Sequence, residues 1–164
     1  MRDPSEAAAT AAEILDGLGV RWALMGALAA DRYRHRPRLT TDVDVLVEPD
    51  AQLRSAFEAA GYEVQPAGDG EQPDMLLVRG RGDRIDVLLA TVDYLRTALD
   101  RADRRVITVE DVIVQKLIAW RPRDRDDVAS ILEAGHALDD GYIATWATAF
   151  DVVDRWGQAQ VWRP

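Results

Sequence analysis

A short alternating segment at residues 42–47 constrains the fold of this chain more than any other part of the sequence. The segment is Asp-Val-Asp-Val-Leu-Val, and successive side chains of an extended strand point to opposite faces of a sheet. Asp42 and Asp44 therefore share one face, while the valines that alternate with them pack on the other. Two carboxylates on one face of a strand suit Mg²⁺, which prefers hard oxygen ligands.

Gly26 comes earlier, between a short apolar run and the helix-forming residues Ala27 to Ala29. Because glycine has no Cβ, a phosphate group can approach the backbone closely where such a helix begins. An Asp-x-Asp pair is weak evidence by itself, since acidic pairs also occur on solvated strand edges and in turns. The order of apolar strand, glycine turn, short helix, basic loop and acidic strand is more specific. It predicts a metal-dependent phosphoryl-transfer site.

The composition is that of an ordinary globular protein and excludes several kinds of site. The chain has 164 residues, 48% hydrophobic and 30% charged, and no apolar run approaches the length of a membrane span. The absence of cysteine excludes disulfides, thiolate zinc sites and thiol catalysis, and two isolated histidines cannot form a multi-histidine metal site. The first residues lack the apolar core of a secretion signal, so we expect a cytoplasmic protein with no membrane partner.

The net charge of −9 disfavours a broad nucleic-acid-binding surface, but one short segment is strongly basic. This segment ends just before the acidic pair and contains Arg32, Arg34, His35, Arg36 and Arg38. One interpretation is a solvated helix end, where arginine interacts favourably with the helix dipole. The other is a counter-charge for a triphosphate, or for an RNA acceptor that enters the same cleft.

Hydrophobic periodicity and turn residues predict the elements along the chain. Strands are expected at residues 20–25, 42–47, 62–65, 75–79 and 84–89, with a hairpin joining the last two. Helices are expected at 6–16 with Ser5 as its cap, at 27–33, and at 51–60 with Asp50 as its cap. From residue 91 the pattern is mostly helical, and Thr108 begins a capping-box helix.

Asp86 lies between two apolar residues of the predicted strand at 84–89. A carboxylate inside an apolar strand is costly unless it is paired or bound to a metal. One explanation is a salt bridge to Arg84 or to another nearby arginine. The other is that Asp86 joins the acidic pair as a third acid, which would bind a second metal ion and act as the base toward an attacking hydroxyl.

Lys116 lies on the apolar stripe of the helix that follows Thr108. Either its stem packs while its ammonium reaches water, or the ammonium faces nucleotide phosphates in the cleft. Asp124 and Asp127 have the spacing of capping residues at the start of a helix over 125–134, and capping explains them adequately.

Two further groups in the C-terminal part also have two interpretations. The arginines at 121, 123 and 125 are expected to form an exposed ion-pair network, with substrate contact by one of them as the alternative. The aromatic residues Tyr142, Trp146, Phe150 and Trp156 recur at helical spacing. They are expected in the core or in a dimer contact rather than in a base-stacking platform.

Together these motifs resemble the minimal nucleotidyltransferases of the DNA polymerase β-like superfamily, especially the branch that contains AbiEii-type toxin proteins. The resemblance rests on Gly26 to Ala29, on Arg38-x-Thr40-x-Asp42-x-Asp44 and on Arg84-Ile85-Asp86. It extends to residues 110–117 and 121–128 and to Tyr142-Ile143-x-x-Trp146, and so covers most of the chain from about residue 20. The Asp-x-Asp motif is specific only together with the glycine turn and the downstream lysine segment, and both are present.

The resemblance implies an α/β (α+β) fold, with a mixed sheet core, helices on one side of it and a C-terminal helical bundle. It implies a core at residues 1–107 and a helical region at 108–164, packed on the core as one compact unit. The implied reaction transfers a nucleoside monophosphate from an NTP to an acceptor hydroxyl and releases pyrophosphate. Two Mg²⁺ ions are expected, with Mn²⁺ as an alternative.

The resemblance also assigns roles by position. Asp42, Asp44 and Asp86 would be the catalytic, metal-binding carboxylates. The nucleotide-binding residues would be Gly26, Ala27, Arg38, Thr40, Lys116 and Asp124. The chain departs from the family pattern at Ala27, where a second glycine is usual, and the added methyl group is expected to weaken NTP binding without abolishing it.

Three functions are compatible with these residues. The first is an active nucleotidyltransferase that modifies tRNA or other RNA as the toxin of a toxin–antitoxin pair, with a cognate antitoxin as its protein partner. The second is a non-catalytic binding or regulatory module, which Ala27 and the acidic surface favour. The third is antibiotic nucleotidylation, which the basic segment beside the site mildly disfavours. An oligomer is compatible with all three.

Overall fold

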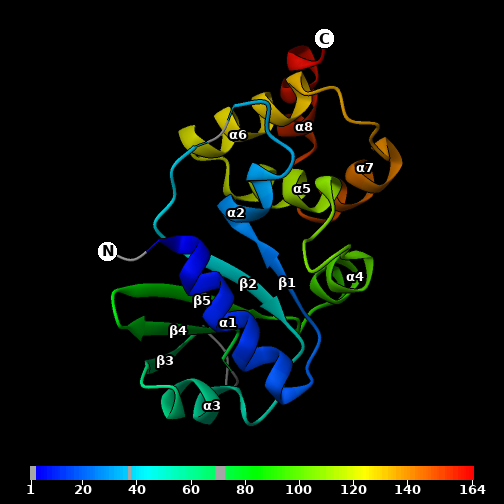
Figure 1. The fold of residues 1–164 in the computed structure, drawn as a ribbon. Helices are drawn as coiled ribbons and strands as arrows, with labels where there is room; N and C mark the ends of the chain where they lie inside the picture. The colour runs from blue at the N-terminus through cyan, green and yellow to red at the C-terminus, as the bar shows by residue number, and fades with distance from the viewer. Residues whose placement is uncertain (1–2, 37, 69–72) are drawn as a thin grey trace.

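The computed structural model describes residues 3–36, 38–68 and 73–164. Over these ranges the chain forms one five-stranded sheet and eight α-helices (Figure 1). The strands are β1 (Trp22–Met25), β2 (Val43–Val47), β3 (Glu63–Ala67), β4 (Met75–Gly80) and β5 (Asp83–Leu89). The helices are α1 (Pro4–Leu18), α2 (Gly26–Asp31), α3 (Leu53–Ala59), α4 (Asp93–Arg101), α5 (Val109–Ala119), α6 (Pro122–Glu133), α7 (Asp140–Ala149) and α8 (Val153–Ala159). None of the helices in these ranges is long and apolar enough to cross a membrane.

The sheet is mixed, with the strand order β1-β2-β5-β4-β3. Strands β2 and β5 run parallel, whereas the other neighbouring pairs are antiparallel. After β2 the chain forms α3 and the outer strands β3 and β4 before β5 returns to the middle of the sheet. The register of the parallel pair aligns Asp44 with Asp86 and Leu46 with Leu88. Residues distant in sequence therefore meet at the centre of the sheet.

Helices α1 and α3 cover one face of the sheet (Figure 1). On this face the alternating valines Val43, Val45 and Val47 of β2 are completely buried. They belong to a hydrophobic core that also contains Leu15 of α1 and Phe57 of α3. The alternation of residues 42–47 thus has the predicted consequence, because one set of side chains forms a core and the acids lie on the other face.

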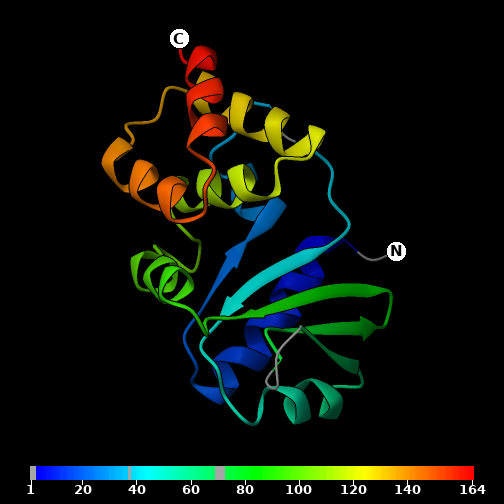
Figure 2. The ribbon, with the colours of Figure 1, turned by 180° about the vertical axis from the view of Figure 1, so that it is seen from behind.

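The opposite face of the sheet is joined to the C-terminal helices, which gather at one end of the molecule (Figure 2). Ala23 of β1 and Leu46 of β2 are buried in a second core with Ile113 and Leu117 of α5. This core continues into α6, α7 and α8. The predicted mixed sheet followed by C-terminal helices is therefore confirmed. The division of the chain at residue 107 stays a prediction.

The predicted starts of α1 and α3 are wrong, and local hydrogen bonds explain both. Helix α1 is capped by Asp3 rather than Ser5, because the Asp3 carboxylate accepts a 2.9 Å hydrogen bond from the backbone N–H of Ser5. Helix α3 begins after residue 51, because the Asp50 carboxylate bonds the N–H of Gln52 at 2.7 Å and forms a turn first. The predicted cap of α5 is confirmed, since the Thr108 side chain accepts from the N–H of Asp111.

Candidate active site

A cavity of about 480 Å³ is lined by residues of the sheet and of helices α4 and α5 and the start of α6. All the residues that the sequence assigns to the site line this cavity. They come from the β1–α2 turn, the loop before β2, strands β2 and β5, and helices α5 and α6. They are Gly26, Ala27, Arg38, Thr40, Asp42, Asp44, Asp86, Lys116 and Asp124. The fold thus brings the predicted residues together, while their individual roles stay predictions.

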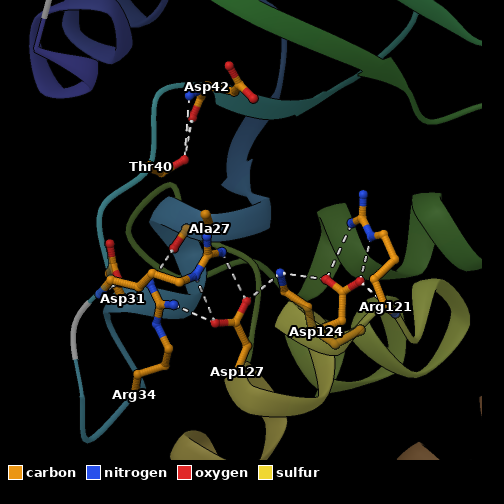
Figure 3. A network of polar contacts seen from close by, with 10 residues as sticks. Ala27, Asp31, Arg34, Thr40, Asp42, Arg121, Asp124 and Asp127 are labelled. Atoms are coloured by element: carbon orange, nitrogen blue, oxygen red, sulfur yellow. Dashed lines mark hydrogen bonds and ion pairs between the residues drawn. The ribbon is translucent and has the colours of Figure 1, made fainter.

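The three acids reach the cavity from two neighbouring strands. Asp44 and Asp86 occupy the same register position on β2 and β5, and both line the cavity. Asp42 immediately precedes β2, and the Thr40 hydroxyl contacts its backbone, 3.3 Å from the carbonyl oxygen and 3.4 Å from the nitrogen (Figure 3). The Thr40 side chain therefore stabilises the backbone of the loop before β2 at Asp42.

Gly26 is required by the position of the Asp44 carboxylate. Its φ is +62°, and a Cβ at this residue would lie 2.0 Å from Asp44 Oδ2. The following backbone N–H, that of Ala27, donates a hydrogen bond to the same carboxylate. The glycine turn thus accommodates a carboxylate of the chain itself, and its contact with a triphosphate stays a prediction.

Asp44 is the acid whose ionisation is most affected by the site. Burial raises its pKa to about 6, and the nearby charges of Asp86 and Asp42 act in the same direction. Lys116 and the N–H of Ala27 oppose the shift without cancelling it. The site therefore concentrates negative charge where burial makes that charge costly.

Asp42 and Asp86 are each paired with an arginine of the sheet. Arg84 Nε lies 3.0 Å from Asp42 Oδ1, and Arg79 Nη2 lies 2.6 Å from Asp86 Oδ1. The salt bridge considered for Asp86 is therefore present, but its partner is Arg79 of β4 rather than Arg84. Among the residues that the structure describes, no three His, Asp or Glu side chains are arranged to hold a metal ion as they stand.

The donor chemistry nevertheless fits Mg²⁺. Asp42, Asp44 and Asp86 offer hard oxygen ligands to one cavity, and their mutual repulsion is the kind that a divalent cation relieves. These three carboxylates are the residues that would hold the metal. Arg84 and Arg79 each contact Oδ1 of their partner, and their positive charge competes with a cation for the same carboxylates.

Asp127 is the centre of a buried ion-pair cluster beside the cavity (Figure 3). Lys116 Nζ lies 2.8 Å from Asp127 Oδ2 and 3.2 Å from Asp124 Oδ1. Arg38 donates to both Asp127 oxygens at 3.3 Å, and Arg34 donates to Oδ1. Because the side chains of Asp127 and Arg34 are only 2% and 1% exposed, this network is an internal connection between the loop before β2 and α6.

Both acids of this cluster are stabilised as carboxylates. Burial opposes the ionisation of Asp127, but Lys116, Arg38 and Arg34 outweigh it and hold its pKa below the ordinary value. Burial likewise opposes ionisation of Asp124, and hydrogen bonds and charge from Arg121 and Lys116 outweigh it. Asp124 and Asp127 therefore keep their negative charge to a lower pH than Asp44 does.

This cluster corrects the predictions for Lys116, Asp124 and Asp127. The ammonium of Lys116 does not reach water at the edge of the fold, because two buried carboxylates hold it while it lines the cavity. Asp124 does not begin α6, because the helix starts at Pro122 and Asp124 bonds back to the N–H of Arg121 at 3.1 Å. Only one contact of Asp124 is therefore a capping contact. The contacts described for Asp127 go to Lys116, Arg34 and Arg38 instead.

The basic segment is mostly neutralised within the protein. Arg34 and Arg38 pair with Asp127, Arg36 Nη2 lies 3.0 Å from a Glu133 oxygen, and Arg32 Nη2 lies 3.5 Å from one of Asp103. Neither interpretation from the sequence therefore holds for the whole segment. Arg38 is the member of it that lines the cavity.

Two residues of the site were missed, although each left a signal. The predicted hairpin pairs Arg79 with Arg84, which puts Arg79 on the same face as Asp86. Asp127 lies three residues after Asp124 and next to buried Val128, on the inward side of α6. Hairpin register therefore indicated Arg79, whereas helical spacing indicated only that Asp127 faces inward.

Five large apolar side chains also line the cavity, and we treat them as one wall. They are Leu88 from β5, Val92 and Leu95 from the start of α4, Ile118 from α5 and Phe150 after α7. We call these five residues the apolar wall. Phe150 was expected in the core or in a dimer contact, but its side chain is partly exposed and lines the cavity.

Comparison with solved structures identifies the fold. The crystal structure of ANT(2″)-Ia in complex with adenylyl-2″-tobramycin matches with a TM-score of 0.57 and 16% identity, over 89% of this chain and 94% of that one. The solution structure of the antibiotic-resistance factor ANT(2″)-Ia matches with a TM-score of 0.57 and 17% identity, over 92% and 91%. The crystal structure of an antigenic nucleotidyltransferase-like protein from Paracoccidioides brasiliensis matches with a TM-score of 0.52 and 16% identity, over 98% and 92%.

No protein-family model matches the chain, and no curated protein matches its sequence. The structural similarity nevertheless covers nearly the whole chain in each comparison. The chain therefore has a nucleotidyltransferase-like fold. Catalysis and the choice of acceptor have to be argued from the site itself.

Proposed function

We propose that this chain is a Mg²⁺-dependent nucleotidyltransferase that moves a nucleoside monophosphate from an NTP to an acceptor hydroxyl. The observation that carries the proposal is the common register of Asp44 and Asp86 on the cavity face of a nucleotidyltransferase-like fold. Asp42 lies beside them, and Lys116 and Arg38 contribute positive charge to the same cavity. This is the arrangement of charges that phosphoryl transfer needs.

In this proposal Asp42, Asp44 and Asp86 hold the metal, which neutralises charge on the transferred phosphate when it is bound. Mg²⁺ is the expected ion, two ions are expected, and Mn²⁺ is an alternative. Asp86 has a second role, because it accepts the proton of the attacking hydroxyl. The raised pKa of Asp44 means that metal binding below about pH 6 also requires loss of a proton.

The basic residues of the cavity bind and orient the triphosphate. Lys116 and Arg38 supply charge, and the turn at Gly26 and Ala27 supplies backbone beside the acids. Asp124 acts through Lys116, whose ammonium it contacts at 3.2 Å, and Thr40 acts by bracing the loop before β2. The predicted weakening of NTP binding by the Ala27 methyl group remains part of the proposal.

The test is transfer of label from each α-³²P-labelled NTP in the presence of Mg²⁺. Total tRNA, proteins and hydroxyl-bearing small molecules serve as acceptors. We expect labelled product from the natural chain and none from Asp44→Asn, which keeps the shape of the side chain and removes the charge. Asp103→Asn is the matched control, since it makes the same change at a side chain that is 72% exposed. Absence of transfer to every acceptor would contradict the proposal.

The AbiEii-type toxin role is a finer proposal within this function. It assigns RNA as the acceptor and a cognate antitoxin protein as the partner, and it is motivated by the motifs that resemble that branch. Labelling of tRNA in the assay above, together with growth arrest on expression that a neighbouring gene relieves, would support it. Labelling of small molecules alone would contradict it.

A non-catalytic module is the second candidate, and the arginine pairs of the acids favour it. Arg84 and Arg79 pair with Asp42 and Asp86 within the chain itself. Calorimetric titration with Mg²⁺ and ATP separates the two candidates. Binding that Asp42→Asn abolishes supports the enzyme, whereas a silent titration supports the module.

A further inference from the structure

Besides the acids, the residues that line the cavity include two chemically different groups. Arg38, Lys116, Arg121 and Arg123 form a basic group, and the apolar wall forms the other. Arg121 and Arg123 belong to the start of α6, whereas Val92 and Leu95 belong to the start of α4, and these two helices lie apart in Figure 1. The cavity therefore offers both basic and apolar contacts to a ligand.

Three of the five residues of the apolar wall are exposed to an unusual degree for large hydrophobic side chains. Val92 is 51% exposed, and Ile118 and Phe150 are each 38% exposed. Within the described residues, these three make up half of the six large hydrophobic residues classed as exposed, and they converge on this one cavity. Clustered exposed hydrophobic side chains are typical of binding surfaces.

The wall is held in place from behind. The ring of Phe150 packs edge-on against buried Tyr94, with 5.2 Å between ring centroids. The Tyr94 hydroxyl in turn donates a 3.2 Å hydrogen bond to the carbonyl oxygen of Asp111 in α5. The aromatic side of the wall is therefore preformed, which lowers the entropy cost of binding a ligand there.

The wall begins directly beside Asp86. Leu88 follows Asp86 by two residues on β5, so the two side chains share the cavity face. In the proposed reaction the acceptor oxygen bonds the α-phosphorus as the bond to pyrophosphate breaks, and Asp86 takes the hydroxyl proton. The attacking and leaving oxygens lie roughly in line on opposite sides of the phosphorus. Because Asp86 takes the proton of the attacking hydroxyl, the acceptor lies beside Asp86 and so beside Leu88 of the apolar wall.

We infer that the apolar wall binds the apolar body of a small hydroxyl-bearing acceptor. This inference rests on the proposed function for the direction of the reaction, but the binding surface exists independently of it. A polycationic acceptor would find no acidic side chain on the wall and would compete with the metal for the three carboxylates. An RNA acceptor, which the toxin role requires, would bring phosphates against a wall that has no basic residue, so the wall favours a small acceptor over RNA. An uncharged molecule with an aromatic or aliphatic body matches the surface best.

Two uncharged sugars test this inference, because they carry the same hydroxyls. Phenyl β-glucoside has an apolar ring, and methyl β-glucoside lacks it. Chemical shifts of Ile, Leu and Val methyl groups are followed by NMR during titration of the whole chain without nucleotide. We expect saturable shifts at Leu88, Leu95 and Ile118 with phenyl β-glucoside, and about tenfold weaker binding of methyl β-glucoside.

A variant and a matched control localise the effect. Ile118→Asn is expected to remove most of the preference for the phenyl sugar. Val161→Asn changes a side chain that is 78% exposed and is not among the cavity residues, so it should keep the preference. A thermal melt of each variant verifies folding, and the shifts at Leu88 report the wall independently of residue 118.

Three outcomes would overturn the inference. The first is equal binding of the two sugars, and the second is stronger shifts at the wall with tobramycin or an oligoribonucleotide. The third is a change in the methyl chemical shifts of the wall with Mg²⁺ and ATP alone, which would assign the wall to binding of the nucleobase. Failure of the proposed function gives a different result, because the phenyl preference then persists while no NTP labels any acceptor.

Discussion

Asp44 and Asp86 stand at the same register position on β2 and β5, the parallel pair of the described sheet. Burial makes the ionisation of Asp44 costly, and the charge of Asp86 adds to that cost. A sheet under selection for stability alone would have apolar side chains here, as it does at the next inward pair, Leu46 and Leu88. The acids are therefore a source of instability that pH and cations can change.

The first prediction concerns the stability of the metal-free protein as a function of pH. The pKa of Asp44 is raised from 3.8 to about 6, so its proton is bound more tightly in the folded chain. The unfavourable contribution of Asp44 is absent below pH 4, develops as the pH rises toward 6 and is complete above it. A shift of this size corresponds to roughly 2–3 kcal/mol. We expect Asp44→Asn to raise the free energy of unfolding by about that amount at pH 8 in EDTA, and not at pH 4.

Urea unfolding at the two pH values measures this difference. The same change at the exposed Asp103 serves as the control and should give less than about 0.5 kcal/mol at either pH. An equal increase in the free energy of unfolding at pH 4 and pH 8 would show that the ionisation of Asp44 does not destabilise the folded chain.

The second prediction concerns the arginines that pair with the acids. Arg84 and Arg79 compete with a metal for Asp42 and Asp86, so removing either positive charge should tighten metal binding. Partly exposed ion pairs contribute up to about 1 kcal/mol, which corresponds to a roughly two- to fivefold lower dissociation constant. We expect this for Arg84→Gln and Arg79→Gln when Mn²⁺ or Mg²⁺ is titrated by calorimetry. Weaker binding would mean that the arginines position the carboxylates for the metal.

The third prediction concerns Asp127. Asp127→Ala leaves Arg34 buried without this counter-charge and removes one of the two carboxylates that hold Lys116. Breaking a buried pair in this way costs roughly 3–5 kcal/mol. The neighbouring Asp126 is exposed on the same helix, so Asp126→Ala should change the unfolding free energy by less than about 0.5 kcal/mol. Similar denaturant midpoints for the two variants would refute a structural role for the cluster.

The fourth prediction concerns the turn at Gly26. In Gly26→Ala the new Cβ would clash with the Asp44 carboxylate, and alanine is strained at a φ of +62°. We expect a loss of at least about 2 kcal/mol in unfolding free energy and loss of Mg²⁺–ATP binding. Gly17→Ala is the control, because a Cβ added there would have nothing within 4 Å and the residue sits in α1, where alanine should stabilise by about 0.5–1 kcal/mol. Equal melting temperatures for the two variants would contradict the clash.

The strands of this fold could be predicted because their patterns are local. The alternation at residues 42–47 indicates both the buried valines and the acidic face, and the glycine-containing turn before β5 indicates the hairpin. The cluster around Asp127 could not be predicted in the same way. Its members come from the loop before β2 and from two C-terminal helices, and no local period relates Arg34 to Lys116.

The cavity likewise combines residues that local patterns place together with residues that only the packing of the fold brings near. Acids at alternate positions indicate a shared face for Asp42 and Asp44, whereas the approach of Asp86 depends on the parallel pairing of β2 and β5. The pairing of Asp86 with Arg79 depends on which residues meet across the hairpin. The apolar wall depends on how α4, α5 and α7 pack, which residue spacing within one helix does not specify.

The parallel pairing of β2 and β5 also bears on how the chain folds. Helix α3 and strands β3 and β4 separate these two strands in sequence, so their pairing closes a long loop. Contacts of this kind slow folding compared with local hairpins. An incompletely folded chain in which β5 has not joined β2 lacks the paired acids altogether. A ligand that needs both Asp44 and Asp86 would therefore bind only the finished sheet, and would protect it from unfolding without rescuing its precursors.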